Sequence, residues 1–348
     1  MPFLSFKNVQ VAGLSAGVPE NVISNLENND SNFSESYNKE DFVKMTGVAE
    51  RRHSWHLTTS DLCYEAAEKL ISDLKWDKND IQGIIFVSQT TDYILPATSC
   101  ILQDRLKLPT DCFAEDIALG CSGWVYGLAT AAALMQGGGI KKMLLMSGDA
   151  KDHYPTNDPL FGHAGTVTAL EYKEGAEGLQ FEFGTDGSGF DAIIIPDGGS
   201  RNQVTADSFI EEEIDGKRYT RLQSRLKGMD VFAFGISTAP KSVKRLAEHF
   251  GFDYQDADFF VFHQANQKMN NMIVKKLKLD PEKVPSCMEH FGNTSSASIP
   301  LTIVTQLQQQ IKAGPLKFIC CGFGVGLSWG SVAFSTNKAV ISDLVECK

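Results

Sequence analysis

The segment Asp116-Ile117-Ala118-Leu119-Gly120-Cys121-Ser122-Gly123-Trp124 decides how the rest of the chain is interpreted. A mostly apolar run, Phe113 to Leu119, predicts a buried strand, and the small residues from Gly127 to Met135 predict a helix. Cys121 would then lie on a tight strand-to-helix turn, at the positive end of a helix dipole. Because the dipole and the free backbone N–H groups favour negative charge, we expect a thiol biased toward thiolate, and therefore a nucleophile.

The composition is that of a soluble globular protein, with 43% hydrophobic and 22% charged residues in 348. The net charge of −11 argues against a general nucleic-acid binder, and an acidic protein partner would need a local basic patch. The eight cysteines form no CxxC pair, and several lie in apolar runs, which favours reduced thiols in a cytoplasm. We see no signal peptide pattern and no apolar run near the roughly 20 residues of a membrane-spanning helix.

The two halves of the chain show the same order of features. Each half has a helical segment, a strand, a second strand and, after a glycine-containing segment, a third strand: 62–74, 81–88, 141–148 and 166–172 in the first half, and 240–250, 258–263, 316–322 and 331–336 in the second. This pattern predicts a duplicated α/β domain, which we divide into residues 1–175 and 176–348. The polar, acidic segment 198–227 interrupts the pattern and predicts an exposed excursion.

Three further elements carry candidate functional residues. His263 ends an apolar strand in Val261-Phe262-His263-Gln264-Ala265-Asn266, where ligand chemistry tends to lie in α/β sheets, although position alone favours a core histidine. Asn293, in Gly292-Asn293-Thr294-Ser295-Ser296, is by itself typical of a turn. The run from Gly322 to Gly330 lets the backbone approach another group closely, and without a Gly-Lys-Ser/Thr ending it does not indicate a phosphate loop.

Taken together, these elements resemble the thiolase-fold condensing enzymes, most closely the ketoacyl-acyl-carrier-protein synthase III family. The matching motifs follow one another in the family's order and spacing over nearly the whole chain. They are Thr46-Gly47-Val48 with Glu50-Arg51-Arg52, Cys121-Ser122-Gly123 with Tyr126-Gly127-Leu128, His263 to Asn266, Gly292 to Ser296, and Gly322 to Gly330. The resemblance implies an α/β thiolase fold with a duplicated five-layered αβαβα arrangement, in a homodimer.

The resemblance also implies a decarboxylative Claisen condensation in fatty-acid or related acyl-chain synthesis. Cys121 would accept an acyl group from a thioester, with the backbone N–H groups of Cys121 and Val325 as the oxyanion hole. His263 and Asn293 would hydrogen-bond the carbonyl of a malonyl thioester while carbon dioxide leaves. No metal or other cofactor is expected, since the substrates are thioesters of coenzyme A or acyl-carrier protein.

Contacts with the carrier and the acyl chain are implied at single positions. Lys268 aligns with a basic family position used for docking the acidic carrier protein, although a solvated helix face over 267–279, with Lys275, Lys276 and Lys278, is an equally good interpretation. Leu95 aligns with a position that reaches across the dimer and shapes the acyl pocket. Phe323, in the closing glycine motif, is a third candidate for substrate binding.

The chain also departs from the family pattern. Gly162-His163-Ala164-Gly165-Thr166 stands where the family has an aspartate-containing glycine motif, and Val325 stands where glycine is usual. The arginine that helps bind coenzyme A has no counterpart in 152–158, and Phe42, Lys44 and Met45 occupy the region of a second aromatic and arginine clasp.

These departures keep other functions open. An acyltransferase that delivers the acyl group to an amine or hydroxyl acceptor would use the same Cys121 and His263, so the sequence does not separate it from a synthase. A degradative thiolase is disfavoured by the His263 and Asn293 motifs, and Cys320 and Cys321 are interpreted as strand residues. A silent partner subunit is disfavoured because nucleophile, histidine and asparagine all persist.

Overall fold

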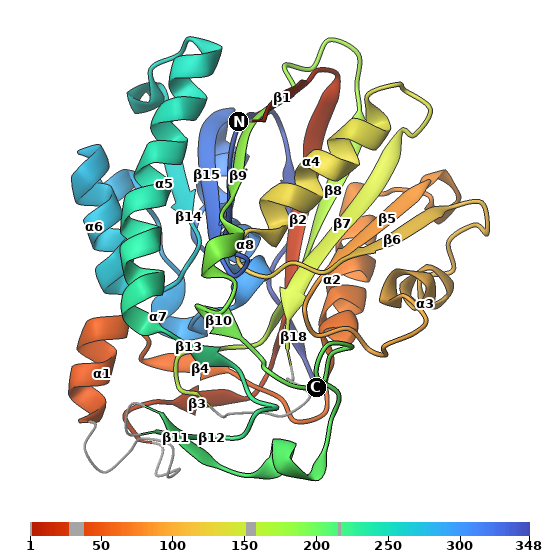
Figure 1. Cartoon of the computed structure of the whole chain (residues 1–348). Helices are drawn as coiled ribbons and strands as arrows, with labels where there is room; N and C mark the ends of the chain where they lie inside the picture. Colours follow the sequence, from red (N-terminus) through yellow and green to blue (C-terminus); the bar gives the residue numbers. More distant parts are fainter. Residues whose placement is uncertain (1, 28–37, 151–157, 215–216) are drawn as a thin grey trace.

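Two large β-sheets form the body of the protein (Figure 1). The structure is a computed structural model that describes residues 2–27, 38–150, 158–214 and 217–348. In the first sheet the strands run in the order β17 (Val340–Ile341), β2 (Val9–Pro19), β8 (Ala164–Tyr172), β7 (Lys142–Asp149), β5 (Gly83–Val87) and β6 (Phe113–Ile117), with β18 (Val345–Cys347) also paired to β2. In the second the order is β1 (Phe3–Phe6), β9 (Leu179–Thr185), β16 (Ser328–Thr336), β15 (Leu316–Gly324) and β14 (Phe259–Phe262).

The predicted repeat is confirmed by the strand pairing. Strand β5 runs parallel to β7, which is antiparallel to β8, and in the same way β14 runs parallel to β15, which is antiparallel to β16. The chain ends cross over, however, because β1 joins the second sheet while β17 and β18 join the first. The division at residue 175 stays a prediction, but neither half so bounded contains every strand of its own sheet.

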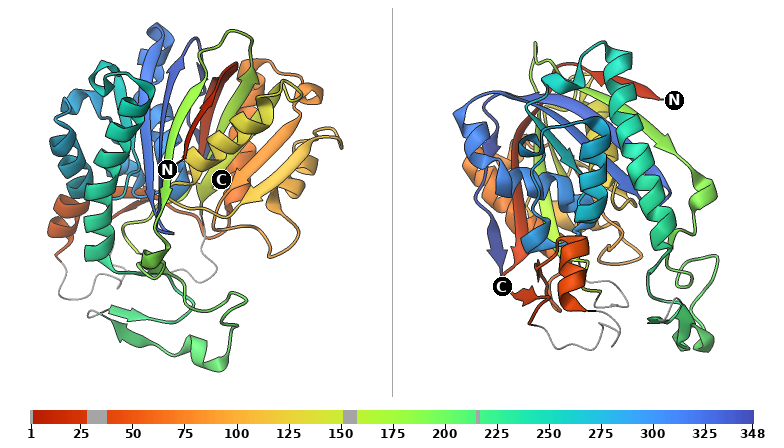
Figure 2. Two further views of the ribbon diagram at one scale, coloured as in Figure 1. Left: turned by 45° about the horizontal axis from the view of Figure 1, so that its top comes forward. Right: turned by 90° about the vertical axis from the view of Figure 1, so that its left-hand side faces the viewer.

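The hydrophobic pattern of each helix determines its layer. Helices α4 (Gly123–Met135) and α8 (Ser298–Gln306) are apolar on most sides and pack in the core between the sheets. Helices α2 (Thr59–Leu74) and α3 (Thr98–Arg105) cover the outer face of the first sheet, and α5 (Gly228–Phe250) and α6 (Gln267–Leu277) cover that of the second (Figures 1 and 2). The predicted five-layered αβαβα arrangement is therefore confirmed.

The prediction of a buried strand before Cys121 is wrong in two respects. Strand β6 ends at Ile117 rather than Leu119, and it is the edge strand of its sheet, so its residues keep partial exposure. Helix α4 begins at Gly123, four residues earlier than predicted. Apolar content alone did not distinguish an edge strand from a central one, because that depends on which strands pair.

Helix α5 contains Pro240, whose missing N–H leaves the carbonyl of Ile236 without a helical partner. Lys276 of α6 fills this vacancy, since its Nζ donates to the Ile236 carbonyl at 2.9 Å. Of the lysines that follow the histidine motif, Lys276 is therefore used to join two helices.

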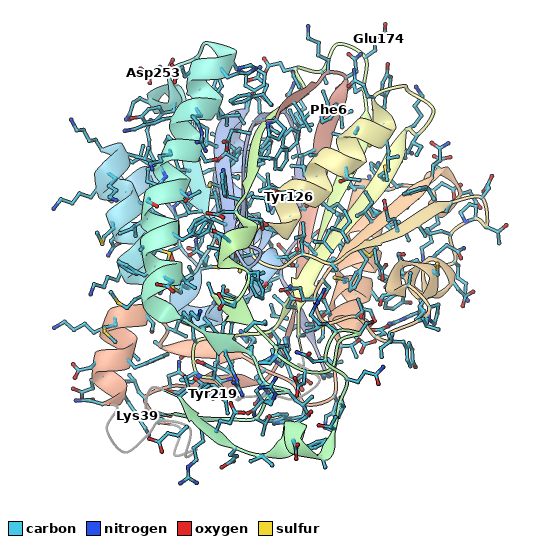
Figure 3. All side chains as sticks on the ribbon, in the orientation of Figure 1. Phe6, Lys39, Tyr126, Glu174, Tyr219 and Asp253 are labelled. Atoms are coloured by element: carbon cyan, nitrogen blue, oxygen red, sulfur yellow. The ribbon has the colours of Figure 1, made fainter. Side chains whose placement is uncertain are left out.

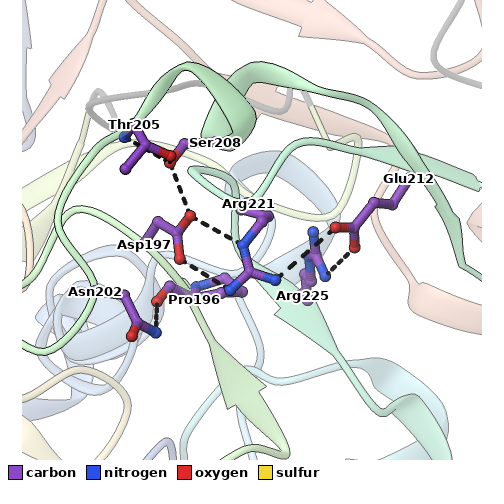
Figure 4. Close-up of polar contacts among 8 residues, drawn as sticks. All are labelled: Pro196, Asp197, Asn202, Thr205, Ser208, Glu212, Arg221 and Arg225. Carbon is purple, nitrogen blue, oxygen red and sulfur yellow. Dashed lines mark hydrogen bonds and ion pairs between the residues drawn. The ribbon is translucent and has the colours of Figure 1, made fainter.

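The segment 198–227 lies outside both sheets, as predicted, and projects from the body (Figure 2). It contains the hairpin β11 (Glu212–Ile214) and β12 (Lys217–Tyr219), and β13 (Arg225–Leu226) pairs with β10 (Ile193–Ile194). Asp197 anchors it by accepting from Arg221 Nε at 2.9 Å and Nη2 at 3.0 Å and from Ser208 at 2.8 Å (Figure 4).

The remaining elements are short. They are β3 (Val22–Ser24), β4 (Glu50–Arg52), α1 (Lys39–Thr46), α7 (Met288–Phe291), α9 (Gln308–Ala313) and six single 3₁₀ turns at 78–80, 187–189, 206–209, 254–256, 281–283 and 295–297. Among the described residues, no helix has the length and apolar character needed to cross a membrane.

Candidate active site

Cys121 lies on the turn between β6 and α4, where the backbone of β15 packs directly against it. A Cβ placed on Gly324 would lie 2.6 Å from Cys121 Sγ, and one on Gly322 would lie 2.9 Å from the Cys121 carbonyl oxygen. Glycine is therefore required at both positions, and the closing glycine motif forms one wall around the thiol. Tyr126, on the first turns of α4, extends toward β9 (Figure 3) and donates to the Gly184 carbonyl at 3.2 Å.

Burial raises the pKa of the Cys121 thiol to about 11. Hydrogen bonds from the backbone N–H of Val325, from the Cys121 N–H and from the Ser295 hydroxyl oppose this rise, while the negative charge of Asp149 adds to it. Removal from water outweighs the favourable N–H groups here, so the pKa of the thiol moves in the direction opposite to the predicted bias toward thiolate. The same contacts place the N–H groups of Val325 and Cys121 at the sulfur.

His263 follows β14 and is only 2% exposed. Its Nδ1 lies 2.8 Å from Ser298 Oγ, and its ring meets Phe323 edge-on with 5.6 Å between the ring centroids. Burial lowers the pKa of His263 to about 4, although a hydrogen bond to the Ser295 backbone favours the charged form. The imidazole is therefore neutral at physiological pH.

Asn293 is held at a fixed position by its own backbone. Its N–H donates to the Leu160 carbonyl at 2.9 Å, and its carbonyl accepts from the Gly162 N–H at 3.1 Å. The side-chain Oδ1 accepts from the Ser295 N–H at 2.9 Å, which leaves the Nδ2 group directed away from that bond as a donor.

Ser295 joins the three predicted residues, and sequence reasoning did not single it out. Its backbone contacts both Asn293 and His263, and its hydroxyl faces Cys121. The residue has a φ of +51°, in the left-handed region that non-glycine residues seldom adopt. The signal in Thr294-Ser295-Ser296 was indistinguishable from an ordinary polar turn. The structure thus brings Cys121, His263 and Asn293 into one site, where central helices α4 and α8 both begin.

Known proteins match the chain over its whole length. Models described as 3-oxoacyl-[acyl-carrier-protein] synthase III and its C-terminal part match residues 115–187 and 247–336. A beta-ketoacyl-[acyl-carrier-protein] synthase III of Bacillus cereus is 32% identical over 95% of this chain and 100% of the relative. A 3-oxoacyl-(acyl-carrier protein) synthase structure from Burkholderia xenovorans has a TM-score of 0.91 and 38% identity, covering 99% of both chains. The chain belongs to the synthase III family.

Other solved structures are less similar to this chain. A synthase III structure from Pseudomonas aeruginosa is 28% identical, with a TM-score of 0.81 and coverage of 96% of this chain and 100% of that one. An OleA structure from Xanthomonas campestris, at 19% identity and a TM-score of 0.76, shows the fold alone. This chain is therefore a divergent synthase III family member.

The altered glycine motif of this synthase III member now has a physical account. His163 lies against His53, with ring centroids 4.2 Å apart, and its Nδ1 accepts from the Ser54 N–H at 3.3 Å. Burial, then the charge of Arg51, lowers the pKa of His53 to about 4. Burial, followed by His53 and Arg51, lowers the pKa of His163 to about 3. The pair borders Gly162, whose N–H holds the Asn293 carbonyl.

We expect this histidine pair to make the folded state acid-sensitive. In the unfolded chain each imidazole has a pKa near 6.5, so below that pH the unfolded state binds protons that the folded state excludes. The free energy of unfolding should fall as the pH decreases from 6.5 toward 4, by up to about 1.4 kcal/mol for each unit of lowered pKa. Urea unfolding at pH 7, 6 and 5 measures this dependence.

His163→Gln should weaken the dependence, because glutamine can accept from Ser54 without titrating. Replacing the exposed His56 by glutamine is the matched control. An unchanged pH dependence in His163→Gln would show that the pair does not remain neutral in the folded protein.

A groove of about 820 Å³ lies between α1 and α6 of this synthase III member. Lys44, Met45, Lys268 and Lys275 are among its lining residues, so the predicted basic position 268 has cationic neighbours from both helices. Phe42, in contrast, is buried with Val48 and Met288. The segment in which the arginine that helps bind coenzyme A has no counterpart lies, over residues 152–157, outside the described residues.

The other predicted positions have different surroundings. Leu95 is 80% exposed on the loop after β5, so its predicted role at an acyl pocket requires a second chain and stays a prediction. Phe323 is 2% exposed behind His263, and its contact with substrate stays a prediction. Asp116 accepts from the N–H groups of Thr98 and Ser99 at 2.7 and 2.8 Å, so it caps α3 and is structural. Within the described residues, no group of three or more His, Cys, Asp or Glu side chains forms a metal-binding cluster.

Proposed function

We propose that this chain condenses an acyl thioester with a malonyl thioester, with loss of carbon dioxide, in fatty-acid or related acyl-chain biosynthesis. The observation that carries the proposal is the convergence of Cys121, His263 and Asn293 on Ser295, in a chain whose relatives are named 3-oxoacyl-acyl-carrier-protein synthases. The chemistry has two stages: Cys121 and the N–H of Val325 serve the first, and His263 and Asn293 serve the second.

In the first stage Cys121 Sγ attacks the thioester carbonyl and loses its proton as the bond forms. Burial raises the pKa of the Cys121 thiol, so its proton has to be transferred during acylation, and it ends on the sulfur of the departing thiol. The N–H groups of Cys121 and Val325 stabilise the oxyanion, and its collapse leaves the acyl group on sulfur.

In the second stage His263 and Asn293 Nδ2 donate to the thioester carbonyl of the malonyl group. Ser298 Oγ lies 2.8 Å from His263 Nδ1, and the proposed role requires the Ser298 hydroxyl to donate there, so that the neutral ring carries its proton on Nε2. The carboxylate leaves as carbon dioxide, and its bonding electrons form an enolate that both donors stabilise. The enolate carbon attacks the acyl carbonyl, and collapse of the adduct breaks its bond to sulfur. The β-ketoacyl thioester departs, and the Cys121 thiolate takes a proton from water.

The test is intact-protein mass spectrometry with a panel of acyl-coenzyme A and acyl-carrier thioesters, followed by malonyl-carrier protein. Acyl mass on Cys121 that disappears as carbon dioxide and a β-ketoacyl carrier form supports the synthase. If Cys121 is acylated but malonyl thioester neither loses carbon dioxide nor removes the acyl group from the enzyme, the synthase proposal is contradicted. That result would favour the acyltransferase with an amine or hydroxyl acceptor.

We propose that the groove between α1 and α6 receives the acidic acyl-carrier protein. Lys44, Lys268 and Lys275 supply positive charge there on a chain of net charge −11, and Lys268 also lies 6.0 Å from the Phe232 ring. Lys268→Glu with Lys275→Glu should raise the KM for malonyl-carrier protein by roughly tenfold or more, since both attraction and steering are lost.

Lys7→Glu with Lys173→Glu, at exposed positions between β1 and β2 and directly after β8, makes the same change of net charge and is the control. The effect of the double variant should shrink in high salt. An unchanged KM for malonyl-carrier protein at low salt would show that the carrier protein does not dock at this groove.

We propose that the protein is a homodimer formed through β6 and the loop after β5. Tyr93, Ile94 and Leu95 are 62%, 94% and 80% exposed beside this edge strand, which is an unusual apolar surface for a monomer. Ile94→Asp with Leu95→Asp should shift sedimentation from dimer to monomer while circular dichroism is retained. A monomeric parent chain would overturn the proposal.

The proposed reaction requires no metal or redox cofactor, because the thiol and the neutral donors supply each charge change. All eight cysteines are free thiols, which supports a reducing compartment such as the cytoplasm as the place of action.

A further inference from the structure

A chain of buried hydroxyl groups connects the nucleophile turn to the glycine segment. Ser122 Oγ lies 2.7 Å from Ser328 Oγ, and the Ser328 hydroxyl donates to the Val325 carbonyl at 2.9 Å. The two serines are 1% and 3% exposed. Because a hydroxyl has one proton and Ser328 uses its own on Val325, Ser122 is the donor of the first bond.

The two hydroxyl bonds lie where the backbone of the nucleophile turn approaches the glycine segment closely. A Cβ on Gly322 would lie 2.9 Å from Ser122 Cα, and one on Gly324 would lie 2.6 Å from Cys121 Sγ. One on Gly326 would lie 3.1 Å from Ser328 Oγ. The glycines thus permit the approach but supply no side chain to maintain it.

An oxyanion donor acts only at a narrow distance of about 2.7–3.1 Å from the developing charge. The N–H of Val325 is such a donor in the proposed function, and its position depends on how the glycine segment is attached. Withdrawing Val325 from Ser328 would break the bond between the Ser328 hydroxyl and the Val325 carbonyl, and moving Ser328 together with Val325 would break the bond to Ser122. Either movement would leave a buried polar group without its partner, which is costly. The attachment therefore resists displacement of Val325.

We propose that Ser122 and Ser328 are positioning residues that hold the Val325 N–H against Cys121. The proposal rests on the proposed function in so far as the acylation step needs that N–H. It also concerns the resting thiol, because the same N–H faces the sulfur before any substrate binds.

The experiment compares Ser328→Ala, Ser122→Ala and Ser328→Thr in the full-length chain, with Cys100→Ala in every variant to remove an exposed competing thiol. One readout is the rate of acyl transfer to Cys121 by mass spectrometry, and the other is the pH profile of Cys121 alkylation by iodoacetamide. Ser15→Ala is the control, since Ser15 forms a buried bond of the same kind, to the Ala66 carbonyl at 2.7 Å.

We expect each alanine variant to slow acyl transfer about tenfold, less than the roughly 10²–10³ lost with a whole oxyanion donor. The alkylation profile should move to higher pH, because the thiolate loses its N–H partner. Ser328→Thr should restore both readouts, while malonyl decarboxylation at His263 and Asn293 should stay unchanged.

Two results would overturn the proposal. One is parent-like acyl transfer and an unmoved alkylation profile in both alanine variants. The other is an equal loss of acyl transfer and malonyl decarboxylation that threonine does not restore, which would mean general damage to the fold. If Ser328→Ala does not fold, Ser122→Ala removes the same bond from the other side. A parent chain that is alkylated but never acylated would overturn the proposed function instead, while the alkylation profiles still test the positioning.

Discussion

Cys121→Ala is expected to abolish acyl-enzyme formation and to reduce condensation on the order of 10⁴-fold or more, since no other group can hold the acyl chain. Intact mass after incubation with acyl thioester should show no adduct, and peptide mapping of the parent should place the adduct on residue 121. Malonyl decarboxylation should be affected far less, because His263 and Asn293 remain in place.

Two other cysteines serve as controls for this result. Cys100 is an exposed thiol, so Cys100→Ala tests whether acylation elsewhere contributes to the adduct. Cys63 is fully buried, and burial raises its pKa well above the ordinary value, so Cys63→Ala tests a core effect. Both variants should retain the adduct. A stable acyl adduct on Cys121→Ala would show that the nucleophile is another residue.

His263→Ala is expected to slow malonyl decarboxylation roughly 10²–10³-fold, the cost of removing one donor to a developing enolate. Acylation of Cys121 should stay within a few-fold of the parent rate, because the proposed oxyanion-hole N–H groups belong to Cys121 and Val325, which the substitution leaves in the chain. Release of labelled carbon dioxide and acyl-enzyme formation, measured separately, separate the two stages.

Asn293→Ala should resemble His263→Ala, and the double variant should lose less than the product of the two effects, because both donors hold one carbonyl. His290→Ala is the control, since His290 is an exposed partner of Glu50 at 3.2 Å. Because burial keeps the pKa of His263 near 4, its ionisation should leave the decarboxylation rate level between pH 6 and 8. Condensation at the parent rate in His263→Ala would mean that the assigned roles are wrong.

Local patterns predicted the repeated α/β order of elements, and the resemblance of the motifs to the synthase III family implied the layered fold and the candidate site residues. The alternation of helical and strand segments in the two halves predicted the repeat, and β5, β7 and β8 indeed pair as β14, β15 and β16 do. The motifs around Cys121, His263 and Asn293 could be compared with those of the family because each of them is a contiguous stretch of a few residues.

Other features depended on residues far apart in the chain. Ser295 could not be identified from the sequence because its role depends on contacts with Cys121 and His263. His163 likewise has no interpretation until the fold places it against His53. The role of Ser328 depends on Ser122, which is 206 residues away in the chain.

The amino-acid sequence by itself determined the repeated α/β order of elements through local periodicity. Its motifs determined the family resemblance, which implies the thiolase fold and the roles of Cys121, His263 and Asn293. Tertiary structure alone decided that β6 is an edge strand, that the chain ends exchange sheets and that burial raises the pKa of the Cys121 thiol. The physical reason is the same in each case: strand neighbours and proton affinity depend on which distant segments exclude water from a group, and no local pattern records them.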